Sequence, residues 1–129
     1  MLGADRPRDR GSWSSPSDRG DGSLLCSGDM LLEALVACAG VTLQAVATSL
    51  GIPVAPARVH AEGDLDFRGT LGVDREAPVG FSAIRLSFDL DAEADEDQLA
   101  TLSKLTERYC VVYQTLACTP AVSTTVAIA

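Results

Sequence analysis

The residues of this sequence with the most distinctive chemistry are its four cysteines, Cys26, Cys38, Cys110 and Cys118. Thiolates attack peroxides and disulfides, and they also bind soft metal ions. The first two are separated by eleven residues and the last two by seven, which matches no zinc motif. His60 is the only histidine that could complete a metal site. We therefore expect thiol chemistry without a metal or other cofactor, although buried structural cysteines are common and fit the same residues.

Other kinds of catalytic and binding sites find little support. His60 lies on the polar face of a segment in which apolar and polar residues alternate, and no nucleophile elbow is near it. We therefore interpret it as a surface histidine. No glycine-rich phosphate loop follows an expected strand. The chain carries 18 acidic against 10 basic residues, a net charge of −8, and only 5% aromatic residues. Such a chain repels a phosphate backbone and lacks stacking platforms, so we expect no nucleic-acid partner.

Composition divides the chain into an arm and a domain. Residues 1–22 are rich in Gly, Pro and Ser and hold four arginines against four aspartates. This segment cannot bury enough apolar surface to offset its ordering entropy, so we expect a flexible arm over 1–22 and a single domain over 23–129. The arm has no apolar core typical of a secretory signal. These features predict a cytoplasmic protein whose thiols are kept reduced.

A long helix is expected directly after the arm. Ser27 is placed as its N-cap, Asp29 adds negative charge to the first turn, and Gly51 followed by Pro53 marks its end. Its roughly 23 residues are enough to cross a membrane. However, Glu33 and many small residues favour a helix buried within protein, and we expect no membrane partner.

The remaining sequence predicts two strands, two helices and a closing strand. The strands cover 58–67 and about 84–90, with a Gly- and Pro-containing connection over 68–80. Asp95 is placed as the cap of one helix, and a shorter helix is expected from Cys110 to about Ala117. This order predicts an α+β domain in which an antiparallel sheet packs against helices. The expected inward residues are Val59, Ala61, Gly63, Leu65 and Phe67; Ile84, Leu86, Phe88 and Leu90; Leu99, Leu102, Leu105 or Thr106, and Tyr109; and Val122, Thr124, Val126 and Ile128.

Two segments resemble one known family. The stretch Ser27–Leu43, SGDMLLEALVACAGVTL, resembles the central helix of the OsmC/Ohr family, the osmotically inducible and organic hydroperoxide resistance proteins. The shared features are a small or acidic cap, a Leu-Leu-x-Ala-Leu run, an Ala-Cys pair and a hydroxyl residue one turn later. The segment ERYCVV around Cys110 resembles the region of the family's second cysteine, and the resemblance covers about residues 20–129.

The resemblance implies an OsmC-like fold, in which two protomers intertwine with their long helices back to back. It also implies a peroxiredoxin-like oxidoreductase of the oxidative stress response that reduces organic hydroperoxides, with Cys38 attacking and Cys110 resolving. The implied partners are a second copy, a small-molecule hydroperoxide and a dithiol or lipoylated reductant. Cys26 and Cys118 have no counterpart and are interpreted as incidental. The alternative is a non-catalytic dimeric domain that binds a small apolar ligand or partner and whose cysteines are structural.

The resemblance further implies an arginine that activates the Cys38 thiolate and is held by an acidic residue near the start of the helix. Asp29 matches that acidic position, although an ordinary first-turn carboxylate has the same signature. Arg10 and Arg19 are the candidate arginines. The segment ahead of the helix is shorter than in the family, which fits an N-terminally shortened chain. Val111 stands where the family usually has a proline after the second cysteine.

Overall fold

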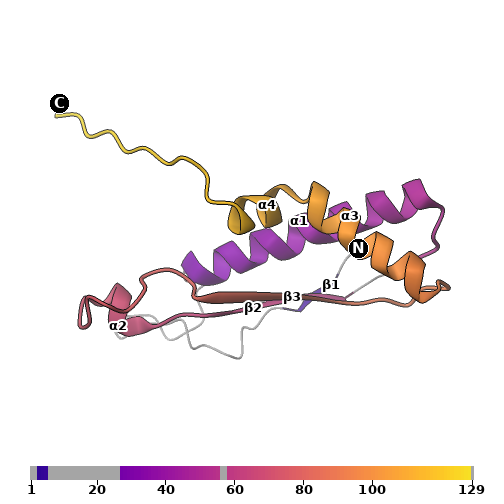
Figure 1. Cartoon of the computed structure of the whole chain (residues 1–129), viewed down its shortest axis with the longest axis horizontal. Helices are drawn as coiled ribbons and strands as arrows, with labels where there is room; N and C mark the ends of the chain where they lie inside the picture. The colour runs from indigo at the N-terminus through magenta and orange to yellow at the C-terminus, as the bar shows by residue number, and fades with distance from the viewer. Residues whose placement is uncertain (1–2, 6–26, 56–57, 129) are drawn as a thin grey trace.

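The computed structural model describes residues 3–5, 27–55 and 58–128. The described elements form two layers, with a sheet on one side and the longer helices packed across one of its faces (Figure 1). The elements in chain order are β1 (Gly3–Asp5), α1 (Ser27–Leu50), β2 (Arg58–Asp64), α2 (Phe67–Thr70), β3 (Ala83–Asp89), α3 (Glu96–Tyr109) and α4 (Val111–Ala117). An α+β fold of this kind agrees with the fold class expected from the sequence.

Helix α1 is the central element of the core. It contacts β2, α3 and α4, and its buried side chains recur every three or four residues, as one face of an α-helix requires. The helix ends at Gly51, whose φ of +68° is a left-handed conformation that glycine adopts without strain. The amides of Gly51 and Ile52 donate to the carbonyls of Thr48 and Ala47, which is the Schellman arrangement. The predicted stop is therefore confirmed, and the helix begins at Ser27 itself, one residue before the expected start.

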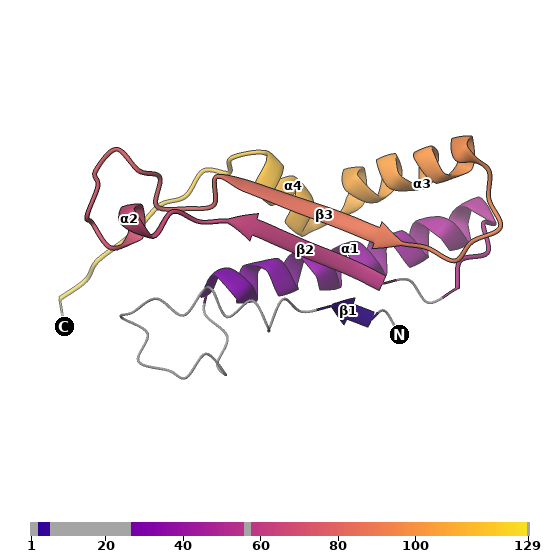
Figure 2. The ribbon, with the colours of Figure 1, turned by 90° about the horizontal axis from the view of Figure 1, so that it is seen from below.

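The sheet has the order β1-β2-β3, with β2 and β3 antiparallel (Figure 2). Val59 pairs with Phe88 and Ala61 with Leu86, so the apolar faces of both strands coincide beneath α1. Val59 and Ala61 are fully buried, as the alternation predicts. On the opposite face, Arg85 forms ion pairs across the ladder with the acidic side chains of β2.

Helices α3 and α4 follow one another with a break at Cys110. Asp95 caps α3 through a capping box with Gln98: the Asp95 Oδ1 accepts from the Gln98 backbone N–H, and the Gln98 Oε1 accepts from the Asp95 backbone N–H. Leu102 and Thr106 carry the buried face of α3. Leu99 and Tyr109, which were expected on the same face, are exposed. The helical periodicity is confirmed, but the contact with the core is narrower than the sequence indicates.

Three expectations about the strands need correction. The first strand ends at Asp64 rather than Phe67, because Asp66 caps the short helix α2 inside the expected connection. The residues Gly3–Asp5, within the segment expected to be a flexible arm, pair in parallel with β2, so the sheet is not purely antiparallel. The prediction of a closing strand is wrong for the single chain. Residues 121–128 are exposed and have no strand partner among the described residues.

Helix α1 is also long and apolar enough to cross a membrane by length and composition alone. In this structure its buried face is Leu32, Leu35, Val36, Ala39, Gly40, Leu43 and Ala47, packed on the sheet and on α3 and α4. Core helices of folded domains pass the same length test. The contacts of α1 agree with the expectation of a helix buried in protein.

Candidate active site

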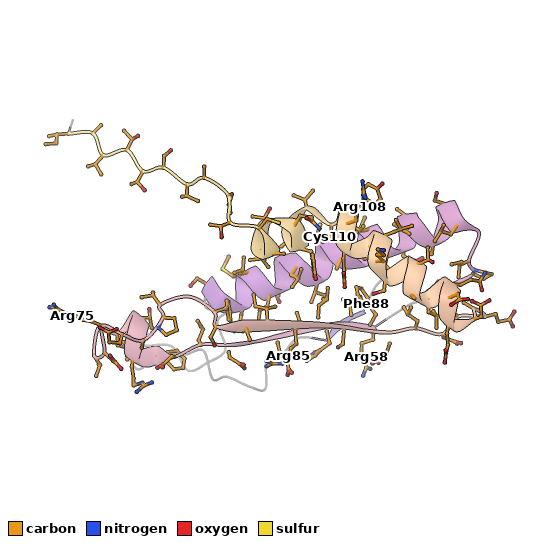
Figure 3. All side chains as sticks on the ribbon, in the orientation of Figure 1. Arg58, Arg75, Arg85, Phe88, Arg108 and Cys110 are labelled. Atoms are coloured by element: carbon orange, nitrogen blue, oxygen red, sulfur yellow. The ribbon has the colours of Figure 1, made fainter. Side chains whose placement is uncertain are left out.

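The structure brings Cys38 and Cys110 together, although 72 positions separate them in the sequence. Cys38 lies in the middle of α1 and is partly exposed, whereas Cys110 is 1% exposed and occupies the break between α3 and α4. Cys38 packs against the core cluster that contains Cys110, and each thiol affects the pKa of the other. Figure 3 shows Cys110 at the α3–α4 junction above α1. Both cysteines are free thiols.

The surroundings of Cys38 favour its thiolate. The backbone amide of Val112 lowers the pKa of the Cys38 thiol below its ordinary value, and this effect outweighs the opposing effect of burial. The Cys110 thiol, the amide of Val111 and the Thr42 hydroxyl lower this pKa further. Val111 and Val112 are the first two residues of α4, so their N–H groups have no acceptor within that helix. The start of α4 therefore supplies the donors that a thiolate at Cys38 needs.

Cys110 has the opposite character. Burial raises the pKa of its thiol, and the neighbouring Cys38 raises it further, against the amide of Tyr113, which lowers it. The Tyr113 N–H donates to the Cys110 sulfur at 3.4 Å, so the side chain acts as the N-cap of α4. The backbone carbonyl of Cys110 accepts a hydrogen bond from the Gln114 amide at 3.0 Å. Cys110 is thus oriented by its bonds to the first turn of α4, and its thiol has a higher pKa than that of Cys38.

No arginine of the described residues activates Cys38. Arg85 is bonded to Glu62 and Asp64, Arg68 to Asp66 and Asp74, and Arg108 lies over the ring of Tyr109. Arg58 and Arg85 point away from the helices, on the far side of the sheet, and Arg75 lies at the tip of the loop beyond α2 (Figure 3). The two arginines expected from the resemblance, Arg10 and Arg19, lie outside the described residues.

The valine after Cys110 has a direct consequence for this site. Proline lacks an N–H, so the proline that the resemblance implies at this position could not contribute the donor that Val111 provides to Cys38. In the sequence alone, valine in place of the implied proline is only an exchange of one apolar residue for another. Its effect on a backbone donor becomes visible only once α4 is seen to begin next to Cys38.

Substitution Val111→Pro tests this contribution. The site accepts proline, because Val111 is the first residue of α4, its side chain is 72% exposed, and Cys110 already has the extended conformation that proline requires before it. We expect the pKa of Cys38 to rise and its alkylation rate at neutral pH to fall about 2- to 10-fold, as for the loss of one hydrogen bond of about 0.5–1.5 kcal/mol.

The measurement is the pH profile of iodoacetamide labelling of the Cys38 peptide, followed by mass spectrometry. Val111→Ala is the matched control, since it shortens the same side chain and keeps the N–H. Alkylation follows the thiolate fraction, so the profile of the proline variant should lie at higher pH than that of the alanine variant. Coincident profiles would show that the Val111 amide does not act on Cys38.

A groove whose lining residues are mostly apolar lies near the cysteine pair. It has a volume of about 380 Å³ and is lined by residues of β3 and α4 and by Leu35 of α1. Leu35 and Tyr113 line the groove and also belong to, or pack against, the cluster that holds both cysteines. Glu107 is its one charged lining residue. The groove can therefore hold an apolar molecule close to the thiols.

The other expected site residues lie apart from the pair. Asp29 is in the first turn of α1, nine positions and about 14 Å along the helix axis from Cys38. Cys118 is exposed at the end of α4, and Cys26 lies outside the described residues. His60 is on the outer face of β2, 3.9 Å from a Glu62 oxygen. The part of the chain that the structure describes has no cluster of His, Cys, Asp and Glu able to hold a metal ion.

Comparisons with known proteins place the chain in a family. Residues 20–125 match the family described as OsmC-like protein. Among solved structures, the chain resembles the crystal structure of an OsmC-like protein from Mycoplasma pneumoniae, with a TM-score of 0.67 and 19% identity over 82% of this chain and 70% of that one. Curated proteins give no match. Because the family match spans most of the sequence and the structural likeness shows the same fold, this chain belongs to the OsmC-like family.

Proposed function

We propose that this protein is a thiol-dependent peroxidase in which Cys38 attacks the peroxide and Cys110 resolves the product. The observation that supports the proposal is the asymmetry of the pair: a partly exposed thiol with a lowered pKa packs against the cluster of a buried thiol with a raised pKa. Attack requires a thiolate, and resolution requires a second thiol within reach. Membership of the OsmC-like family supports a peroxidase-related role.

The reaction proceeds in two steps. The Cys38 thiolate attacks one oxygen of the hydroperoxide, the O–O bond breaks, and the alkoxide leaves and takes a proton to become an alcohol. The sulfur of Cys38 is oxidised by two electrons to a sulfenic acid. The Cys110 sulfur then displaces the hydroxyl group, which leaves as water with the Cys110 proton, and a disulfide forms. A dithiol or lipoylated reductant supplies the two electrons that return both thiols.

The groove favours organic over inorganic peroxides. Its lining is mainly aliphatic and aromatic, contributed by β3, α4 and α1. Burying the carbon chain or ring of an organic hydroperoxide there releases water from apolar surface, at about 25 cal/mol per Å². Hydrogen peroxide has no such group. We therefore expect kcat/KM for cumene or lipid hydroperoxide to exceed that for hydrogen peroxide.

The alternative function, a non-catalytic domain that binds a small apolar ligand, is supported by the same groove. The two functions differ in what they require of the cysteines. A binding domain does not need a lowered pKa at Cys38, and its ligand affinity would be insensitive to alkylation of a thiol outside the groove lining. The lowered pKa of Cys38 is why we place the peroxidase first.

The proposal is tested by steady-state consumption of cumene hydroperoxide with the purified protein and reduced lipoamide or dithiothreitol. We expect many turnovers per chain and a pH–rate profile that rises as Cys38 ionises and then reaches a plateau. The same assay with hydrogen peroxide should give a lower kcat/KM. If neither peroxide is consumed faster than by free dithiol at the same concentration, the protein is not a peroxidase.

A further inference from the structure

The groove near the cysteine pair has a single charged side chain in its lining, and that charge is negative. Glu107 lines the groove together with mostly apolar residues of β3 and α4. None of the described lining residues is a lysine, an arginine or a histidine. The whole chain also carries a net charge of −8. A negatively charged group bound in this groove would therefore meet a like charge, with no cation in the lining to offset it.

The position of Glu107 is unfavourable for the helix that carries it. Helix α3 ends at Tyr109, so Glu107 lies in its last turn. The C-terminal end of a helix has unpaired carbonyl groups and a partial negative charge, which favour a cation there and disfavour a carboxylate. Glu96 and Asp97, in contrast, lie in the first turn of α3, where a negative charge is favourable. The stability of the helix therefore does not explain a carboxylate at position 107.

No contact compensates for this placement. The Glu107 carboxylate forms no hydrogen bond or ion pair with another described residue, whereas its backbone carbonyl accepts from Nε2 of Gln114 at 2.8 Å. Arg108 lies over the ring of Tyr109 at 5.6 Å, on the side of α3 away from the sheet (Figure 3). The bond from Gln114 joins the last turn of α3 to α4 across the break at Cys110. A residue that breaks a local preference without a stabilising contact is a candidate for a functional role.

We propose that Glu107 makes the groove selective for uncharged organic substrates and disfavours substrates that carry a carboxylate. This inference rests on the proposed use of the groove, and it narrows the substrate class to neutral aryl, alkyl and esterified lipid hydroperoxides. A neutral substrate releases water from apolar surface when it binds. A carboxylate must also give up its own hydration and approach the Glu107 carboxylate. The selectivity thus comes from repulsion of the wrong substrate.

Two ligands that are not peroxides measure this selectivity without any redox chemistry. Cumyl alcohol is the neutral product that cumene hydroperoxide gives on reduction, and its para-carboxylate derivative is the same molecule with a negative charge. The affinity of the reduced protein for each is measured by chemical-shift titration. In the unchanged protein we expect the anion to bind about tenfold more weakly than the alcohol. Glu107→Gln keeps the length of the side chain and removes its charge, so this ratio should fall about two- to fivefold.

Glu96→Gln is the matched control. It removes the same charge from the same helix, at an exposed residue that does not line the groove. Its ratio of affinities should therefore stay close to that of the unchanged protein. The two variants should also differ in stability: Glu107→Gln should unfold at the same or a higher urea concentration than the unchanged protein, and Glu96→Gln at the same or a lower one, because the helix ends prefer opposite charges.

Four results would each overturn the proposal. They are equal ratios in the two variants, an anion that binds the unchanged protein as tightly as the alcohol does, binding of neither ligand, and a loss of stability in Glu107→Gln. The last result would show that the carboxylate serves the fold. Because neither ligand is a peroxide, a protein that shows the expected ratios but consumes no hydroperoxide would contradict the proposed peroxidase and not this selectivity.

Discussion

Cys38→Ser is expected to abolish hydroperoxide consumption, with a loss in kcat/KM on the order of 10³-fold or more, as for the removal of other covalent nucleophiles. A serine hydroxyl at this position is not ionised near neutral pH, so the donors at the start of α4 have no thiolate to stabilise. The fold should be retained, because the substitution exchanges sulfur for oxygen at a partly exposed position.

Cys118→Ser is the matched control, since Cys118 is also a free cysteine but lies exposed at the end of α4. Its peroxide consumption should remain within about twofold of the unchanged protein, because an exposed side chain away from the site rarely affects function by more. The measurement is the initial rate with cumene hydroperoxide and dithiothreitol. A Cys38→Ser protein that retains the parent rate would show that another group reacts with the peroxide.

Cys110→Ser is expected to change the product of the first turnover. Without reductant, the unchanged protein should consume about one equivalent of hydroperoxide per chain and form a disulfide. The variant should consume about one equivalent and stop at the sulfenic acid of Cys38, because no thiol remains beside it. Serine is the informative replacement because its oxygen can still accept the Tyr113 N–H and cap α4.

Trapping with dimedone and mass spectrometry measures this difference. We expect close to one adduct at Cys38 in Cys110→Ser and almost none in the unchanged protein. Cys110→Ala is a second comparison, which also removes the cap of α4 at a cost of about 0.5–2 kcal/mol. Equal trapping in the unchanged protein and in Cys110→Ser would mean that Cys110 does not resolve the intermediate.

Local sequence patterns predicted the elements that position the site. Three of these features depend only on neighbouring residues, and the structure contains all three: the buried period of α1, its end at Gly51, and the alternation of β2 and β3. The capping box at Asp95 is equally local. The prediction of a strand at 122–128 was wrong for the single chain. Alternation indicates an extended, half-buried segment, but it does not indicate which neighbour that segment pairs with. The short helix α2 was missed because four residues are too few for a period.

The candidate site was predictable in part. Both cysteines could be named from residue type and from the family resemblance, but neither pattern alone places Cys38 next to Cys110. The donors on Cys38 could not be foreseen, because Val111 and Val112 act through backbone N–H groups that every residue except proline has. The one signal in the sequence was the absence of proline after Cys110, and its meaning depends on where α4 begins.

Cys38 and Cys110 are proposed to form one redox pair, and mapping the disulfide tests this pairing most directly. The reduced protein is treated with one equivalent of cumene hydroperoxide, alkylated, digested without reduction and analysed by mass spectrometry. The proposed mechanism predicts a single major cross-linked species that joins the Cys38 and Cys110 peptides, with Cys118 recovered as the alkylated thiol. Recovery of both Cys38 and Cys110 as alkylated thiols, or a disulfide that joins either one to Cys26 or Cys118, would contradict it.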